Sequence, residues 1–303
     1  MIKMNNTSYL YELLEDPQKI SKLKYKTISR ILNEARGKLG QENLLIELNN
    51  KEKHVFIIGD IHGNLKSLLK LIDLVRSNKA THVIFLGDIV DRGPFQLECL
   101  ITVLILKILE PNIYYILKGN HETLEMNQYY GFYQDFISRF KNEGDFNEIL
   151  ALYSVLPYAA LVDEQILCVH GGIPEDIEIL NKLKGIKTDN LREIWNFLSK
   201  QLIQITWNDP KEDIKGFIDS FRGPGIKFFG KDVFERFMKA NNLRYLIRSH
   251  EMFLEGYKWF FNRRLLSIFS SENYRGRYSK NPASYALING YKNVIAKTID
   301  FHP

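Results

Sequence analysis

Five short polar clusters, each directly after a run of apolar residues, contain most of the side chains that could do chemistry. Three of them are Gly59-Asp60-Ile61-His62-Gly63-Asn64, Gly87-Asp88-Ile89-Val90-Asp91-Arg92-Gly93 and Gly119-Asn120-His121-Glu122. The other two, His170-Gly171-Gly172 and Arg248-Ser249-His250, follow later apolar runs. Together they supply carboxylates, a carboxamide and imidazoles as potential metal ligands, and they contain no thiolate.

Oxygen and nitrogen ligands without thiolates suit manganese, iron or zinc. Two such ions, about 3.5 to 4 Å apart, can share one carboxylate and one hydroxide, and they also polarise a phosphoryl oxygen. We expect Asp60 and His62 to hold the first ion and Asp88 to bridge the two. The residues expected to complete the second ion are Asn120, His170 and His250. This donor set predicts hydrolysis of a phosphate ester by direct in-line attack of the bridging hydroxide.

The remaining polar residues of these clusters have roles in the same reaction. His121 directly follows an expected ligand, so its imidazole should reach the edge of the site and protonate the leaving alkoxide. Asp91 can accept a hydrogen bond from the other ring nitrogen of His121. Arg92 and Arg222 present planar guanidinium groups that match phosphate oxygens, a geometry that lysine lacks.

The elements that must position these clusters are short strands and helices. The apolar runs at 55–58, 83–86 and 113–117 predict buried strands, and the helical spacing at 65–75 and 96–109 predicts the helices between them. This pattern is a β-α-β-α-β unit, whose strand ends form the ligand crevice in open α/β sheets. Later strand-like runs lie at 166–169, 245–247, 265–269, 285–288 and 294–296.

The chain changes its pattern at about residue 50. Residues 8–49 carry apolar positions at helical spacing with many lysines between them, so we expect residues 1–50 to form an N-terminal helical extension. Residues 51–303 are expected to form one catalytic domain, because no linker rich in proline and glycine divides them.

Composition excludes several classes of protein. The 303 residues carry 41 Lys and Arg against 36 Asp and Glu, a net charge of +5, which is too small a surplus to indicate a nucleic-acid partner. The longest apolar run, 101–109, contains Lys107 and is about half the length that spans a bilayer, so no membrane partner is expected. Only two cysteines are present, which favours a reducing, cytoplasmic setting.

The clusters also match a known family. The segments GDIHGN (59–64), GDIVDRG (87–93), GNHE (119–122), HGG (170–172) and RSH (248–250) resemble the PPP family of metal-dependent serine/threonine protein phosphatases, over about residues 50 to 297. Further similarity to the protein phosphatase 1 and 2A type lies in WNDP (207–210), FRGPG (221–225), FFG (228–230) and FSSENYRG (269–276).

The resemblance implies a metallophosphoesterase (calcineurin-like) α/β fold, with a central β-sandwich flanked by helices on both outer sides. It implies the same six metal ligands, the acid pair His121 and Asp91, and contacts to the substrate phosphate from Arg92, Asn120, Arg222 and Tyr274. The role of Tyr274 comes from the family alone. The chain departs from the family where Ser271, Glu272 and Arg275 replace alanine, proline and cysteine, so covalent attack by the family's cysteine-directed toxins is not expected.

These observations predict a protein serine/threonine phosphatase with two divalent ions, manganese first and iron or zinc as alternatives, that acts on phosphoprotein substrates. A dinucleoside polyphosphate hydrolase is an alternative, because Arg92-Gly93-Pro94 is slightly similar to that group, but WNDP and NYRG argue against it. A nuclease of the same superfamily is disfavoured by the arginine of DRG. A binding module without catalysis should lack a ligand or the acid, and none is missing. The sequence identifies no regulatory subunit.

Overall fold

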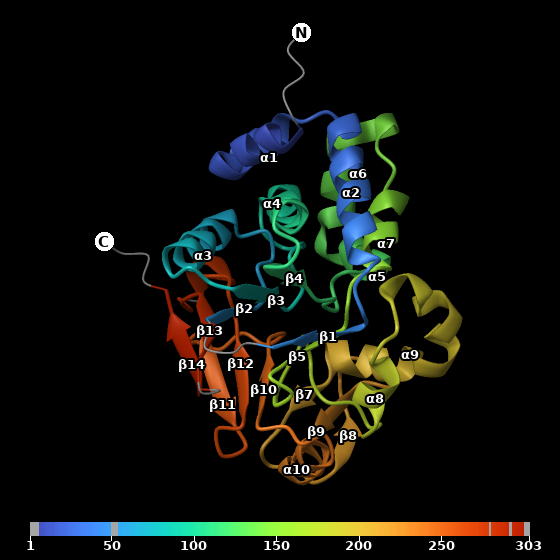
Figure 1. The fold of residues 1–303 in the computed structure, drawn as a ribbon, viewed down its shortest axis with the longest axis vertical. Helices are drawn as coiled ribbons and strands as arrows, with labels where there is room; N and C mark the ends of the chain where they lie inside the picture. Colours follow the sequence, from blue (N-terminus) through green and yellow to red (C-terminus); the bar gives the residue numbers. More distant parts are fainter. Residues whose placement is uncertain (1–5, 50–53, 279, 291–292, 300–303) are drawn as a thin grey trace.

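Two β-sheets packed face to face form the centre of the computed structural model, which describes residues 6–49, 54–278, 280–290 and 293–299 (Figure 1). The first sheet has five strands in the order β14-β13-β2-β3-β4. Their bounds are β2 Val55–Ile58, β3 His82–Phe85, β4 Tyr114–Ile116, β13 Ser284–Asn289 and β14 Asn293–Thr298. Because β2, β3 and β4 are parallel, their carboxyl ends lie at one edge of this sheet.

The second sheet has six strands in the order β1-β5-β6-β10-β12-β11. Their bounds are β1 Leu45–Leu48, β5 Ala159–Val162, β6 Ile166–Val169, β10 Tyr245–Arg248, β11 Tyr257–Phe260 and β12 Leu265–Ile268. β6, β10 and β12 are parallel to one another. A small three-stranded sheet, β7 Asp209–Pro210, β8 Phe217–Asp219 and β9 Lys227–Phe229, lies outside the sandwich.

Side chains alternate between the two faces of each central strand, as the period of a strand requires. Ile57 and Ile84 of the first sheet share one buried cluster with Cys168 and Ile247 of the second, which is the interior of the sandwich. The neighbouring residues point outward, as Phe56 does into the cluster formed with the helices. A strand buried on both faces needs apolar residues at every position, which explains the continuous apolar run Val55–Ile58.

Helices cover both outer faces of the sandwich (Figure 1). Those on the five-stranded sheet are α1 Asn6–Glu15, η1 Pro17–Lys22, α2 Tyr25–Leu39, α3 Leu65–Ser77, α4 Gln96–Leu109, α5 Leu124–Tyr130, α6 Phe132–Phe140, η2 Lys141–Glu143 and α7 Asn147–Tyr153. Those nearer the six-stranded sheet are α8 Ile179–Leu183, η3 Thr188–Asn190, α9 Leu191–Trp207 and α10 Lys231–Ala240. A further 3-10 turn, η4, spans Gly276–Tyr278.

The predicted β-α-β-α-β beginning is confirmed, and α4 has the predicted bounds. The prediction that residues 8–49 are helical is wrong for Leu45–Leu48, which form β1 and pair in parallel with β5. β1 lies at the edge of its sheet, and Glu47 is its one exposed residue, so its burial does not follow the regular alternation of a strand with one face in water. The division of the chain at about residue 50 into extension and catalytic domain stays a prediction.

Candidate metal centre and acid pair

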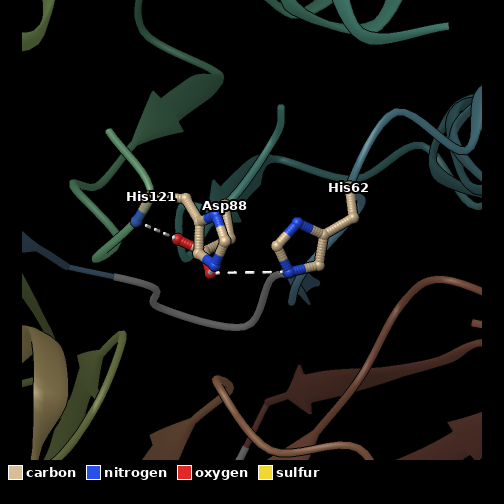
Figure 2. Close-up of side chains that lie close together, drawn as sticks. All are labelled: His62, Asp88 and His121. Atoms are coloured by element: carbon tan, nitrogen blue, oxygen red, sulfur yellow. Dashed lines mark hydrogen bonds and ion pairs between the residues drawn. The ribbon is translucent and has the colours of Figure 1, made fainter. Parts of the chain in front are cut away.

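The polar clusters that follow β2, β3 and β4 meet at the common edge of these strands. Figure 2 shows that the side chains of His62, Asp88 and His121 lie close together. The Nε2 atom of His62 lies 3.6 Å from Oδ2 of Asp88, and the backbone N–H of His121 donates to Oδ1 of Asp88 at 2.9 Å. Asp60 completes this half, with its Oδ2 3.5 Å from Nε2 of His62. All four residues are buried.

The second sheet contributes the other half of the cluster. The Nε2 atom of His170, which follows β6, lies 3.4 Å from Oδ2 of Asp88. The same nitrogen is 2.9 Å from Oδ1 of Asn120 and 3.2 Å from Nδ1 of His250, which follows β10. The structure therefore brings together all six residues predicted as metal ligands.

Backbone carbonyls set the orientation of two imidazoles. Nδ1 of His62 lies 2.9 Å from the carbonyl oxygen of Val90, and Nδ1 of His170 lies 3.0 Å from that of Leu86. A carbonyl oxygen only accepts, so each Nδ1 carries a proton and donates it. Nε2 of each ring then faces the carboxylates, which is the usual way in which proteins orient histidine ligands.

Two glycines allow the strand-end loops to approach one another. Gly87 has φ of +106°, and a Cβ on it would lie 2.2 Å from the backbone nitrogen of Gly119. A Cβ on Gly119 would lie 2.2 Å from Oδ1 of Asp88. Any larger residue at either position would push the loop that carries Asn120 and His121 away from Asp88.

The carboxylates are held by groups outside the expected ligand set. Oδ1 of Asp60 accepts from the hydroxyl of Ser249 and, at 3.0 Å, from the backbone N–H of His250. Its Oδ2 is thereby left facing His62. Glu122, inside the GNHE cluster, accepts from the backbone N–H groups of Asp88 at 3.0 Å and Gly119 at 2.7 Å. It therefore joins two of the strand-end loops.

The electrostatics of the cluster favour cations near the carboxylates. Burial by itself raises the pKa of Asp88, but the charges of His170 and His121 lower that pKa well below its ordinary value. Burial, together with the charges of Arg222 and His170, lowers the pKa of His250 well below its ordinary value. The His250 ring is thus neutral, and its buried Nε2 has no hydrogen-bond partner among the described residues.

The donor set fits divalent metal ions. Ligand atoms of Asp88, His170 and His250 lie within 4.8 Å of one another, and so do those of His62, Asp88 and His121. Carboxylate oxygens and imidazole nitrogens that converge on one buried space are the donors that divalent transition-metal ions prefer. His121 differs from His62 and His170, because its Nδ1 is bonded to the carboxylate of Asp91 and not to a backbone carbonyl.

The predicted acid pair is formed. Nδ1 of His121 donates to Oδ2 of Asp91 at 2.7 Å, and Nε2 lies 3.9 Å from Oδ2 of Asp88. The backbone N–H of Phe132, the first residue of α6, donates to Oδ1 of Asp91 at 3.1 Å. The imidazole therefore presents Nε2 to Asp88 and uses its other nitrogen for orientation.

The predicted phosphate contacts lie on two sides of the cluster. The Tyr274 ring stacks on the His62 ring with centroids 5.1 Å apart, and the guanidinium carbon of Arg92 lies 4.0 Å from the ring centroid of Tyr130 and 5.4 Å from that of Tyr274. Arg222 is on the other side, where its Nε donates to Oδ2 of Asp209 at 2.5 Å.

Sequence reasoning missed the residues that support Arg222. The side chain of Arg248 is fully buried and donates to Oδ1 of Asp209 at 2.7 Å and to the carbonyl oxygen of Gly171 at 2.6 Å. Asp209 thus lies between two arginines. Arg248 and Asp209 stand inside the RSH and WNDP segments, so their position in these motifs was the only available signal.

Comparison with known proteins agrees with this geometry. The family model for calcineurin-like phosphoesterases matches residues 53–253. A catalytic subunit of protein phosphatase 2A from Dictyostelium discoideum is 32% identical over 287 residues, 94% of this chain and 89% of that protein. The serine/threonine-protein phosphatase 6 catalytic subunit of Caenorhabditis elegans is 37% identical over 233 residues, 77% of this chain and 69% of that protein.

Among solved structures, a protein serine/threonine phosphatase from Saccharomyces cerevisiae with similarity to human phosphatase PP5 superimposes with a TM-score of 0.78 at 29% identity, covering 93% of this chain and 92% of that chain. The chain belongs to the calcineurin-like phosphoesterase family. Within that family it is a member of the PPP serine/threonine phosphatases, and the predicted fold is confirmed. None of the helices in the described part of the chain has the length and apolar character needed to cross a membrane.

Proposed function

We propose that the protein is a metal-dependent phosphatase that hydrolyses phosphoserine and phosphothreonine esters in phosphoprotein substrates. The observation that carries this proposal is the His121–Asp91 pair, 2.7 Å apart, beside a cluster of buried carboxylates and imidazoles. An alkoxide is a poor leaving group, and a proton donor next to the phosphate can protonate the leaving oxygen as the bond to phosphorus breaks. The family relationship supports the same reaction.

We assign Asp60, His62, Asp88, Asn120, His170 and His250 as the residues that would hold two divalent ions, manganese being our first choice. When bound, the ions would lower the pKa of water and polarise a phosphoryl oxygen. The Irving–Williams order and cellular availability leave iron and zinc as alternatives for the same donors. A cytoplasmic location is also proposed, supported by the two free, buried cysteines, Cys99 and Cys168.

The chain's own residues account for binding and proton transfer. Arg92 and Arg222 hold phosphate oxygens from two sides, with Asn120 and Tyr274 as further contacts. The oxygen of water forms the new bond to phosphorus while the bond to the serine or threonine oxygen breaks, and the protons of the water remain on the phosphate product. The electron pair of that bond stays on the leaving oxygen, which takes the proton from Nε2 of His121. Asp91 keeps the ring in place through Nδ1.

Replacement of His121 by asparagine tests this assignment. The variant should lose about 10² to 10⁴ in kcat on a phosphoserine peptide with Mn²⁺, because it lacks the proton donor. Its metal content by elemental analysis should match that of the unmodified protein. Loss of metal in this variant would refute the assignment of His121 as an acid and not a ligand.

A substrate panel tests the reaction class. Release of phosphate from phosphoserine peptides under Mn²⁺ should exceed turnover of diadenosine tetraphosphate, and double-stranded DNA should stay intact. Preferential turnover of the dinucleotide, or cleavage of the DNA, would replace the proposed function by one of its alternatives.

A further inference from the structure

We propose that Asn127 is a positioning residue for proton transfer, because it holds both members of the acid pair in one geometry; this inference rests on the proposed role of His121. The Asn127 side chain is 0% exposed. Its Nδ2 donates to Oδ2 of Asp91 at 2.9 Å and to the backbone carbonyl of His121 at 2.8 Å. One amide nitrogen thus connects the general acid to its carboxylate partner.

The local structure of α5 places this amide. The side chain of Thr123 caps the helix by accepting from the backbone N–H of Met126 at 3.3 Å, and the backbone N–H of Asn127 donates to the Thr123 carbonyl at 3.1 Å. Residue 127 therefore lies one turn after the helix start. Helical side chains lean toward the N-terminus of the helix, so the amide of Asn127 reaches back to His121, just before the helix.

The partners of Asn127 fix the orientation of its amide. A carboxylate and a carbonyl oxygen only accept, so the nitrogen of the amide must face them and the oxygen must face away. Asp91 has its other oxygen bonded to the backbone N–H of Phe132 at 3.1 Å. Removal of Nδ2 leaves Oδ2 of Asp91, which orients the His121 ring, with that ring as its one remaining partner among the described contacts.

Tyr153 is the residue next to the other end of the Asn127 amide. The buried hydroxyl of Tyr153 lies near the Asn127 side chain, and neither that hydroxyl nor Oδ1 of Asn127 has a hydrogen-bond partner within the described part of the chain. Burial, with the charges of Glu122 and Asp91, raises the pKa of the Tyr153 phenol well above its ordinary value, so the phenol keeps its proton. It is the donor suited to Oδ1, and it supports the same amide orientation.

Loss of the Asn127 amide should slow the reaction only of substrates whose leaving oxygen needs a proton. The bond to the leaving oxygen breaks as that oxygen accepts the proton from Nε2 of His121. A misaligned imidazole therefore slows the loss of a basic oxygen, whereas 4-nitrophenolate departs without a proton. Phenyl phosphate and 4-nitrophenyl phosphate are a matched pair of substrates, because they differ in the basicity of the leaving oxygen and little in size.

The test measures kcat/KM of the Mn²⁺-loaded protein on both substrates. Asn127→Ala should lose about 10- to 100-fold on phenyl phosphate, as substitutions behind a reacting group do, and about threefold or less on 4-nitrophenyl phosphate. Tyr153→Phe should show a smaller loss with the same selectivity. Metal content should be unchanged in both variants. An equal loss on the two substrates, or no loss, would overturn the inference.

Two further variants control for folding. Asn127→Leu nearly keeps the size of the side chain but offers no donor, so it should show the selective loss even if Asn127→Ala does not fold. Asn208 is the matched control: it is also 0% exposed, its Nδ2 donates to the Ile173 carbonyl at 2.9 Å, and its Oδ1 accepts from the Lys227 backbone at 2.7 Å. Asn208→Ala should affect both substrates equally; a selective loss there would overturn the inference.

His121→Asn separates this inference from the proposed function. If His121→Asn is selective for phenyl phosphate and the Asn127 variants are not, the positioning role alone is wrong. If His121→Asn loses equally on both substrates, the assignment of His121 as general acid is wrong, and the role of Asn127 falls with it.

Discussion

Lys118, directly before the loop that carries Asn120 and His121, should make the stability of the protein depend on pH. Its Nζ donates to the backbone carbonyls of Glu122 at 2.8 Å and Tyr153 at 2.9 Å, and it forms no ion pair within the described part of the chain. Burial, opposed by the charge of Glu122, lowers the pKa of Lys118 from 10.5 to about 8. The protonated ammonium is therefore less stable in the folded protein than in the unfolded chain.

The sign and size of the effect follow from this difference in pKa. Between pH 8 and pH 10.5, about the two pKa values of Lys118, the unfolded chain binds more protons than the folded protein, so the free energy of unfolding rises with pH. At about 1.4 kcal/mol for each pKa unit, the fall from 10.5 to about 8 corresponds to about 3 kcal/mol over the whole range. From about pH 7 to about pH 9.5, roughly 2 kcal/mol of this should be measurable.

Urea unfolding of the EDTA-treated protein and of its Lys118→Met variant at these two pH values isolates the contribution of Lys118. Other groups titrate in both proteins alike, so their effects cancel in the difference between the two free energies of unfolding. The unmodified protein should gain about 2 kcal/mol relative to the variant as the pH rises. Lys26→Met, which removes an exposed lysine of α2, should show no such change. A constant difference between the unmodified protein and Lys118→Met would refute the reasoning.

Three other substitutions test the proposed bridging ligand, a proposed phosphate contact and a buried ion pair. Asp88→Asn should lower the metal content measured by elemental analysis, because it removes the proposed bridging charge, and full occupancy would contradict that role. Arg222→Lys should reduce kcat/KM on a phosphopeptide by about tenfold, because lysine lacks the planar pair of donors, and unchanged kinetics would remove Arg222 from the phosphate site. Lys107→Met should cost about 3 to 5 kcal/mol in urea unfolding, because it leaves Glu42 in a largely buried position without its ion partner. Adding Glu42→Gln to Lys107→Met should recover part of the lost free energy of unfolding. No recovery would show that the unpaired charge of Glu42 is not the cause of the loss.

The parts of the fold that could be predicted are those in which local pattern and environment agree. The run Val55–Ile58 is apolar at every position because both of its faces are buried, and α4 is apolar over most of its circumference because helices and sheet surround it. The segment Leu45–Leu48 reads as the continuation of a helical pattern, because four residues are too few to separate the two periods. Its pairing with β5, more than 100 residues away, makes this segment a strand, and the local sequence does not indicate that pairing.

The residues of the candidate site also differ in whether the sequence alone can indicate them. Asp60, Asp88 and His121 could be predicted to lie together, because their chemistry and their position after a strand suffice. Asn127 could not, because a single asparagine inside a short helix is ordinary until the fold brings Asp91 against it. A residue that acts through another residue has no pattern of its own in the sequence, and its role follows only from three-dimensional contacts.

Backbone conformation gives the clearest sign that the site residues are held by the rest of the fold. Five of the fourteen described non-glycine residues with positive φ belong to the site, namely His62, Asp88, Asp91, Arg92 and His250, with φ between 47° and 72°. Each costs about 1 to 2 kcal/mol relative to an ordinary conformation. The Asp88 carbonyl accepts from the backbone N–H groups of Ile61 and His62, both at 3.0 Å, so one strained loop holds the next. Strain that neighbouring loops hold in this way fixes the side chains before a substrate arrives, and the proton transfer that we propose for His121 requires such alignment.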